Sequence, residues 1–332
     1  MNSDHFPIKL FNEISILGGL LDYQCVMKVY QTANFYFRMS RPSQLLLIAA
    51  VYGWGVLVAL TLPGSQIDPM LIMAGLPPLL FVSASIHYAN EHADYETDAL
   101  TLRTRYSGGS GAMQDLHASP ETALKAAWLS LIIGISVAVF FVASGLLPLV
   151  TFPILILGAF GGWMYSLRPL ALAWRGWGEA TNAFLGGMLL PVFGYAVLSA
   201  RIDWRIILLT LPFALFAFDN LLATTWPDRS ADRQVGKFTL ATLWSTGRLR
   251  TLYFLTWLGA FQVLILIHGR ILPTPIFWAS LLILPAVVWS DRTYTRQHSP
   301  FPSVLVMVLF LVIQIAGWSV MVAYPSVFNA SG

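Results

Sequence analysis

Residues 69–98 read PMLIMAGLPPLLFVSASIHYANEHADYETD, an apolar run that passes directly into an acidic segment. A helix needs about 20 mostly apolar residues to cross roughly 30 Å of hydrocarbon, so the apolar part of this stretch predicts a membrane-spanning helix. The composition extends the prediction to the whole chain, because 57% of its 332 residues are hydrophobic and only 11% are charged. Soluble domains carry roughly a quarter of their residues as charged side chains, so an ordinary soluble enzyme is excluded.

About nine such apolar runs follow one another along the chain, each bounded by Pro, Gly or charged residues. They cover approximately residues 44–62, 70–89, 122–144, 148–166, 179–199, 205–226, 249–268, 273–290 and 302–323. The fourth and eighth runs are short, so the count carries an error of about one. The sequence predicts an all-α, polytopic membrane protein.

The distribution of basic residues supports this count and gives an orientation. With nine spans, 16 of the 19 Lys and Arg residues fall on one side of the membrane, and only Arg201, Arg205 and Arg270 fall on the other. Loops rich in Lys and Arg remain on the cytoplasmic side. We therefore expect a cytoplasmic N-terminus and an external C-terminus, in what is most simply a prokaryotic cytoplasmic membrane.

The chain divides into a polar N-terminal segment and one membrane domain. Residues 1–40 are too polar to span and lack the order of a signal peptide, so they predict either an interfacial helix or a poorly ordered tail, and residues 41–332 form the membrane domain. The net charge of +3 reflects this membrane asymmetry, and no nucleic-acid partner is expected. The single cysteine, Cys25, excludes an internal disulfide and leaves carboxylates and histidines as the plausible metal ligands.

Polar side chains gather in two segments, at the cytoplasmic ends of the second and sixth spans. Residues four apart on a helix share one face, so Asn90, Asp94 and Asp98 form one polar ridge, and Asp228 and Asp232 form another. The second ridge continues back into its span through residues 224 and 220, which makes Asn220 a candidate to line a cavity.

These two ridges predict a site for a metal and a diphosphate. Carboxylates at this spacing repel one another unless a cation lies between them, and Mg²⁺ typically binds one or two carboxylates together with the phosphate oxygens of a substrate. The neighbouring basic residues can supply the remaining positive charge. They are Arg103, Arg105, Arg229, Arg233 and Lys237.

At these residues the sequence resembles the UbiA superfamily of intramembrane prenyltransferases. The first signature of that family, N-x-x-x-D-x-x-x-D, matches Asn90, Asp94 and Asp98. The second, D-x-x-x-D followed by G-K-x-T-L, matches Asp228, Asp232 and residues 236–240. Family-like stretches also occur at Arg41-Pro42, at residues 103–111 and at residues 165–170.

The resemblance implies nine helices around a central cavity that cytoplasmic loops close, with Mg²⁺ bridging the carboxylates to a prenyl diphosphate. Asp94, Asp98, Asp228 and Asp232 would then be metal ligands, with Asn90 as a polar partner. Contacts to substrate would come from the residues that complete the predicted site: Arg103, Arg105, Lys237, Arg233 and Asn220. One departure concerns Thr224, where many members carry Asn.

The expected reaction is transfer of a prenyl group from a polyprenyl diphosphate to an aromatic acceptor in quinone or lipid biosynthesis, with release of diphosphate. The resemblance is nearer to the 1,4-dihydroxy-2-naphthoate branch than to the 4-hydroxybenzoate branch, because Arg168 and Pro169 stand where hydroxybenzoate enzymes tend to have Lys. Another acceptor, such as 4-hydroxybenzoate, homogentisate or a lipid alcohol, and cyclisation of the prenyl diphosphate both remain open.

Two different classes also have intramembrane carboxylates. A secondary transporter would carry them near the bilayer midplane, whereas here they gather at one face beside Lys and Arg. A CDP-alcohol phosphotransferase would show a D-G-x-x-A-R signature, which this sequence lacks. The position of the acidic residues therefore favours an enzyme acting on a phosphate-bearing substrate.

Overall fold

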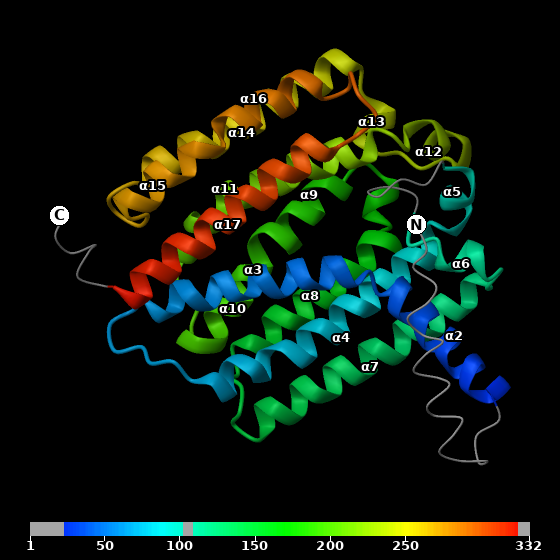
Figure 1. The fold of residues 1–332 in the computed structure, drawn as a ribbon, viewed down its shortest axis with the longest axis horizontal. Helices are drawn as coiled ribbons and strands as arrows, with labels where there is room; N and C mark the ends of the chain where they lie inside the picture. The colour runs from blue at the N-terminus through cyan, green and yellow to red at the C-terminus, as the bar shows by residue number, and fades with distance from the viewer. Residues whose placement is uncertain (1–22, 102–108, 325–332) are drawn as a thin grey trace.

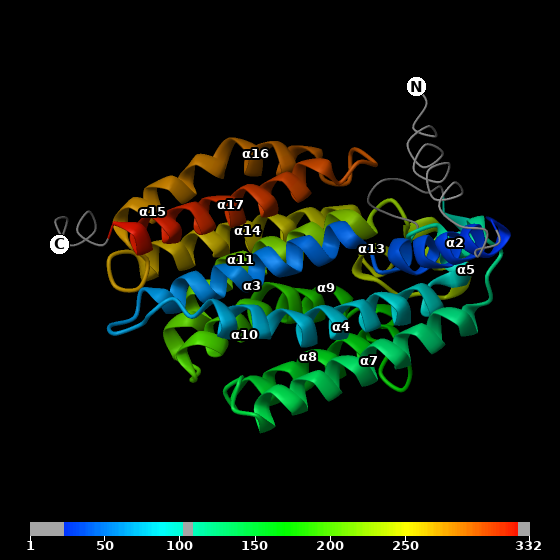
Figure 2. The ribbon, with the colours of Figure 1, turned by 60° about the horizontal axis from the view of Figure 1, so that its bottom comes forward.

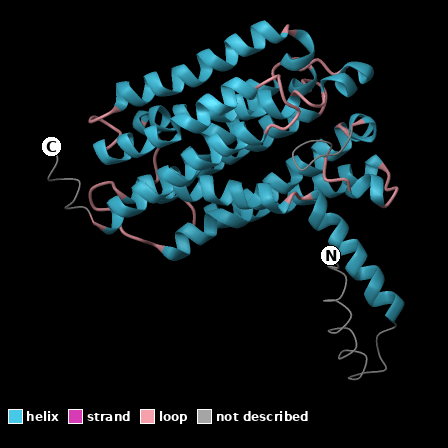
Figure 3. Cartoon of the chain, turned by 45° about the horizontal axis from the view of Figure 1, so that its top comes forward, coloured by secondary structure: helices cyan, strands magenta, loops and turns pink. Residues whose placement is uncertain are grey.

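The computed structural model describes residues 23–101 and 109–324, and all regular elements among them are helices (Figure 3). Eight are long and apolar enough to cross a membrane. They are α3 (Pro42–Leu60), α4 (Pro69–Ala93), α7 (Pro120–Ala143), α9 to α10 (Gly178–Ser199), α11 (Trp204–Thr225), α14 (Thr246–Ile267), α15 to α16 (Thr274–Thr293) and α17 (Phe301–Ala323). The shorter apolar helix α8 (Thr151–Ser166) fills the place of the fourth predicted span. The predicted all-helical membrane fold with about nine spans is therefore confirmed.

Two of the long spans are not regular α-helices throughout. The fifth consists of α9 (Gly178–Asn182), a π-helical stretch, η2 (Ala183–Leu189), and α10 (Leu190–Ser199). The eighth consists of α15 (Thr274–Ser280), one 3-10 turn, η3 (Leu281–Ile283), and α16 (Leu284–Thr293). π-Helical turns inside α-helices are frequently found at functional sites, and residues of η2 line the cavity described below.

Prolines and polar caps fix where the helices begin. Pro42, Pro69 and Pro120 each stand at the first helical position, where the missing amide hydrogen costs nothing and the fixed φ suits the helix. Asp68 caps α4 by accepting a hydrogen bond from the Leu71 amide. The turn signals that bounded the apolar runs in the sequence are thus the actual helix starts.

The bundle has two similar halves in its packing. α4 packs most extensively on α7 in the first half, and α11 packs on α14 in the second, so the second and third spans of each half form equivalent pairs. The first span of each half, α3 and α10, cross each other closely in the middle. A Cβ added to Gly55 of α3 would lie 1.9 Å from the Pro191 carbonyl oxygen, and one added to Gly194 would lie 2.1 Å from that of Tyr52. Only glycine permits this approach.

The short helices gather at one end of the bundle (Figures 1 and 2). These are α2 (Tyr23–Met39), α5 (Tyr95–Leu100), α6 (Ala112–Asp115), α12 (Arg229–Val235) and α13 (Leu240–Leu243). The last helix, α17, ends at the opposite end of the bundle. Both acidic segments therefore lie at the same end, as their positions in the sequence predict.

The outward faces of the spans carry large apolar side chains. Phe140, Leu266 and Leu282 are more than 60% exposed, which in a soluble protein would be an aggregation hazard. Together with the eight spanning helices, these faces identify an integral membrane protein. α2 covers part of the predicted N-terminal segment and exposes Val29 and Phe37. Residues 1–22 lie outside the described part, so the boundary at residues 40 and 41 stays a prediction.

Candidate active site

A cavity of about 1080 Å³ opens between α3, α4, α8, the fifth span, α11 and α17. One end is lined by charged and amide side chains, including both acidic ridges. The other is lined by aliphatic and aromatic residues such as Leu79, Leu189 and Phe193. A cavity of this form can hold a molecule with an anionic head and a long apolar tail.

The first acidic ridge runs across the junction of α4 and α5. Asp94 is the cap residue that directly follows α4, and the amides of Asp94 and Asp98 donate to the carbonyl oxygens four residues earlier, at 2.9 and 2.8 Å. The helical spacing therefore continues through the break, and Asn90, Asp94 and Asp98 all line the cavity. The amide oxygen of Asn90 accepts a hydrogen bond of 3.1 Å from Ser166 of α8, which fixes its orientation.

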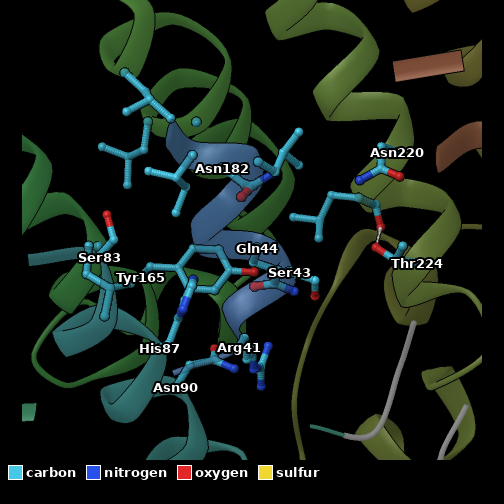
Figure 4. A pocket seen from close by; sticks show the side chains of 18 of the residues that line it. Arg41, Ser43, Gln44, Ser83, His87, Asn90, Tyr165, Asn182, Asn220 and Thr224 are labelled. Atoms are coloured by element: carbon cyan, nitrogen blue, oxygen red, sulfur yellow. Dashed lines mark hydrogen bonds between the residues drawn. The ribbon is translucent and has the colours of Figure 1, made fainter. Parts of the chain in front are cut away.

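The second ridge lies on α11 and α12 across the cavity. Asn220, Thr224, Asp228 and Asp232 all line it, so the four-residue stripe in the sequence is a true cavity face, and Figure 4 shows Asn220 and Thr224 opposite the α4 residues. The Thr224 hydroxyl donates to the Leu221 carbonyl at 3.1 Å. The single hydroxyl hydrogen of Thr224 is thus donated within the helix. An Asn side chain at this position would still have amide hydrogens to donate to a ligand in the cavity.

Lys237 connects the two ridges. Its ammonium group donates to Asp94 Oδ1 at 2.8 Å and lies 3.8 Å from Asp232 Oδ1. Gly236 adopts the left-handed conformation that ends α12, and the Lys237 amide then bonds back to the Asp232 carbonyl at 2.8 Å. This turn at the C-terminal end of α12 points the lysine side chain toward the first ridge. Lys237 and Asp94 are 143 residues apart in the sequence.

The charges of the site are not balanced by Lys237 alone. Burial raises the pKa of Asp98 to about 7, with Asp94 adding to the effect, and burial likewise raises the pKa of Asp232 to about 7. Lys237 itself has a raised pKa although burial opposes its charge, because Asp94 and Asp232 surround it. The negative charge of the carboxylates therefore exceeds the positive charge of Lys237, and a bound cation could neutralise the rest.

The donors suit a hard divalent cation shared with a ligand. Among the residues described, no three acidic or histidine side chains are close enough to hold a metal by themselves. Two separate pairs of carboxylates facing one polar space instead match Mg²⁺, which binds few protein oxygens and takes the rest from phosphate and water. The cation would thus be held jointly by the protein and by an anionic ligand.

The structure also brings polar residues to the cavity that the sequence pattern did not single out. Figure 4 shows Arg41, Ser43, Gln44 and Tyr165 beside the α4 ridge. Ser83 and Asn182 also line the cavity, and so does His87, which its place one turn before Asn90 already made a candidate in the sequence. Isolated polar residues in apolar spans have no repeating spacing to detect, although Arg41-Pro42 and Tyr165 do lie in stretches that carry the family resemblance.

Four of the five predicted basic residues are not placed at the cavity by the described part of the structure. The Arg233 guanidinium does not line it, because it points to α13 and donates to the Thr242 carbonyl at 2.9 Å. Arg103 and Arg105 lie outside the described residues. Arg229 stacks on Trp226, 3.7 Å from the ring centre, and donates to its carbonyl. Among the described residues, Lys237 is the one predicted basic residue that lines the cavity.

Comparison with known proteins adds independent findings. The model of the UbiA prenyltransferase family matches residues 46–312. The 1,4-dihydroxy-2-naphthoate octaprenyltransferase of Bacillus subtilis (strain 168) is 23% identical over 247 residues, covering 73% of this chain and 76% of that protein.

Two solved structures share the fold. A UbiA homologue from Archaeoglobus fulgidus bound to DMAPP and Mg²⁺ has a TM-score of 0.63 at 19% identity, covering 86% of this chain and 99% of that one. The apo structure of a UbiA homologue from Aeropyrum pernix K1 has a TM-score of 0.64 at 14% identity, covering 84% and 98%.

Proposed function

This chain belongs to the UbiA prenyltransferase family, and from that premise we propose that it transfers a prenyl group from a polyprenyl diphosphate to an aromatic acceptor with Mg²⁺ as cofactor. The observation that carries the proposal is the cavity itself. Its polar end joins two carboxylate ridges through Lys237, and its other end is apolar. The Archaeoglobus homologue of the same fold was solved with DMAPP and Mg²⁺, which supports this choice of substrate and metal.

Each predicted residue then has a role. Asp94, Asp98, Asp228 and Asp232 hold Mg²⁺, with Asn90 as a polar partner. When bound, the metal supplies the positive charge that stabilises the departing diphosphate. Lys237 adds a fixed ammonium group at the same place. Asn220, Arg103, Arg105 and Arg233 stay predicted substrate contacts, and the direction of the Arg233 side chain makes it the weakest of these.

The cavity walls favour the chemistry that follows. As the allylic C–O bond breaks, its electron pair leaves with the diphosphate, and positive charge develops on the allylic carbon. The apolar lining, including Phe193, excludes the water that would trap this carbon. The electron-rich ring of the acceptor forms the new C–C bond, and loss of a proton or of carbon dioxide from the attacked carbon restores the aromatic ring.

We infer 1,4-dihydroxy-2-naphthoate, or a similar phenol, as the acceptor. The Bacillus subtilis relative is named for this substrate, and a flat apolar ring with polar edges suits a wall that bears Tyr165 and His87. Other acceptors of the family, namely 4-hydroxybenzoate, homogentisate and lipid alcohols, are the alternatives, as is cyclisation of the prenyl diphosphate.

The decisive experiment offers purified protein a panel of acceptors with a long prenyl diphosphate and Mg²⁺. Mass spectrometry of the lipid extract should show prenylated naphthoquinol, and no product without Mg²⁺. Efficient product from 4-hydroxybenzoate with the dihydroxynaphthoate left untouched would overturn the acceptor. A protein that transfers prenyl groups to no acceptor on the panel and releases no diphosphate would overturn the activity.

We propose that the end of the bundle with the acidic ridges faces the cytoplasm. This end carries most of the basic residues, and α17 ends at the other. In a Cys25→Ser background, Glu121→Cys at the exposed start of α7 should resist a membrane-impermeant thiol reagent in intact cells. Arg270→Cys, exposed between α14 and α15, should react. The reverse labelling pattern would refute this orientation.

Mg²⁺ should stabilise the protein more at pH 8 than at pH 6. In the folded protein the pKa of Asp98 and of Asp232 is about 7, against an ordinary value of 3.8. Without metal, the folded state therefore keeps protons that the unfolded state has lost, and the free energy of unfolding falls as pH rises from about 4 to about 7.

Mg²⁺ binds these carboxylates only when they are ionised. The stabilisation by Mg²⁺ should therefore increase as pH rises from about 4 to about 7 and stay constant above pH 7. Thermal unfolding in detergent, with and without Mg²⁺ at each pH, measures the effect. The variant Asp232→Asn should lose about half of the pH dependence of the Mg²⁺ shift, because Asp98 still titrates in the same range. Equal Mg²⁺ shifts at pH 6 and pH 8 in the unmodified protein would contradict the assignment.

A further inference from the structure

Glu91 is a buried carboxylate next to the cavity that the proposed reaction does not use. It follows Asn90 on α4, is 2% exposed and does not line the cavity. Burying a carboxylate is costly unless donors surround it, and here four hydrogen bonds do so. They come from two segments that do line the cavity, at Arg41 and at Ser110.

The first segment is the turn that leads into α3. Arg41 Nε and Nη2 donate to Glu91 Oε1 at 3.0 and 2.7 Å. The Arg41 backbone has φ 53 and ψ 66, a left-handed conformation that a non-glycine residue rarely adopts and that surrounding contacts must maintain. One helical turn before Glu91, His87 Nδ1 donates to the Ser40 carbonyl at 2.6 Å. Two successive turns of α4 thus hold this junction.

The second segment is the glycine-rich turn at residues 109–111. The Ser110 amide donates to Glu91 Oε1 at 2.9 Å, and its hydroxyl donates to Glu91 Oε2 at 2.7 Å. The adjacent Gly109, at φ +66, packs so closely on the first acidic ridge that an added Cβ would lie 2.1 Å from Asp98 Oδ2. The turn is therefore set directly against a predicted metal ligand.

We propose that Glu91 is a positioning residue that joins the α3 entry turn to the 109–111 turn, so that the Arg41 guanidinium and the Ser110 turn face the anionic group of a substrate. The proposal rests on the function proposed above. The anionic group is either the diphosphate of the prenyl donor or the carboxylate of the acceptor, since a guanidinium recognises both by the same paired hydrogen bonds.

The bonding pattern favours this role over a simple buried ion pair. Arg41 gives Glu91 only Nε and Nη2, so its Nη1 hydrogens remain for a ligand in the cavity that Arg41 lines. Glu91 in turn is satisfied by both segments, so its negative charge does not face the bound anion. One carboxylate therefore fixes two binding elements that lie 50 and 19 residues away in sequence.

The test is a double-mutant cycle between the two residues. Arg41→Ala should raise the KM of one substrate by about 10- to 100-fold, as expected for loss of a hydrogen bond to a charged group. Glu91→Ala should cause a similar rise because the arginine loses its orientation. The double variant should then resemble Glu91→Ala alone, because Glu91 already holds both Arg41 and the Ser110 turn and residues that act through one another are not additive.

Three further variants sharpen the result. Glu91→Gln keeps an acceptor oxygen for Arg41 and should lose less activity than Glu91→Ala, while Ser110→Ala should give an intermediate loss. Glu121→Gln is the matched control, because Glu121 is exposed and lies away from the cavity. The substrate whose KM rises identifies the anion. If an acceptor analogue without its carboxylate abolishes the difference between variants, the anion is that carboxylate.

A second measurement does not depend on activity. The Ser110 amide is hydrogen-bonded to Glu91, so Glu91→Ala should speed its hydrogen exchange, and Arg41→Ala should not. Multiplicative losses in the kinetic cycle, or unchanged exchange at Ser110, would overturn the proposal. Glu91→Gln and Ser110→Ala provide the same comparisons if Glu91→Ala does not fold. An unmodified protein without transferase activity would instead overturn the proposed function.

Discussion

Replacement of Asp94 or Asp228 by alanine should lower Mg²⁺-dependent prenyl transfer by about 10²-fold or more. Each residue belongs to a different ridge, so each loss removes one side of the proposed metal site. Loss of a ligand from a site that stabilises a departing diphosphate costs several kcal/mol in the transition state, and each 1.4 kcal/mol is a factor of about ten in rate. Initial rates at saturating prenyl diphosphate, with Mg²⁺ titrated, measure this effect.

The protein should stay folded in both variants. In Asp94→Ala, Lys237 retains Asp232 at 3.8 Å as a partner, so its ammonium group is not left without a counter-charge. Glu96→Ala is the control, because Glu96 lies within the same acidic segment but is exposed and away from the cavity. Gel filtration and thermal unfolding check the fold. Near-normal turnover in Asp94→Ala and Asp228→Ala would remove the basis for the metal site.

Alanine at Gly55 or Gly194 should destabilise the protein severely. The added methyl group would lie 1.9 Å from the Pro191 carbonyl oxygen or 2.1 Å from that of Tyr52. The obstructing atoms belong to helix backbone, which cannot rotate away as a side chain can, so α3 and α10 must separate. Overpacking commonly costs 1–3 kcal/mol even where side chains can adjust, and we expect about 3 kcal/mol or more here.

Thermal unfolding in detergent, compared with that of Gly53→Ala, tests the prediction. Gly53 lies on the same helix, and a Cβ there would meet nothing within 4 Å. Alanine favours helix over glycine by up to about 1 kcal/mol, so the control should have an unchanged or slightly higher Tm. If Gly55→Ala and Gly194→Ala unfolded at the same temperature as Gly53→Ala, the close crossing of α3 and α10 would be wrong.

Local spacing explains what could be predicted from the sequence. The number of spans follows from the runs of apolar residues. The placement of Asn220 at the cavity follows from the four-residue steps that lead from it through Thr224 to Asp228. Both patterns are contained within one helix. The residues of the two ridges could be recognised for the same reason, although the role of their carboxylates as metal ligands stays a prediction.

Contacts between distant segments could not be predicted in this way. The bond between Lys237 and Asp94 spans 143 residues, and the bond between Arg41 and Glu91 spans 50. Each depends on how helices cross, which a single sequence does not show. Arg233 illustrates the converse, because its nearness to the second ridge in sequence indicated the cavity, while the rotation of α12 turns its guanidinium toward Thr242.

The short helix α8 bears on the depth of the proposed reaction centre in the membrane. Its 16 residues extend about 24 Å at 1.5 Å each, which is less than the roughly 30 Å thickness of the hydrocarbon layer. The outward-facing Leu157 and Phe160 require lipid contact, so the bilayer thins beside α8 or its ends lie beneath the headgroups.

Tyr165 and Ser166, at the polar end of the cavity, belong to the last turn of this helix. We therefore expect the proposed reaction centre to lie below the membrane surface, near the level where the acyl chains begin. A prenylated product formed at that depth would lie at the level of the lipid tails. Hydrophobic mismatch at one helix would thereby link turnover to bilayer thickness, a dependence that reconstitution in lipids of increasing chain length would measure.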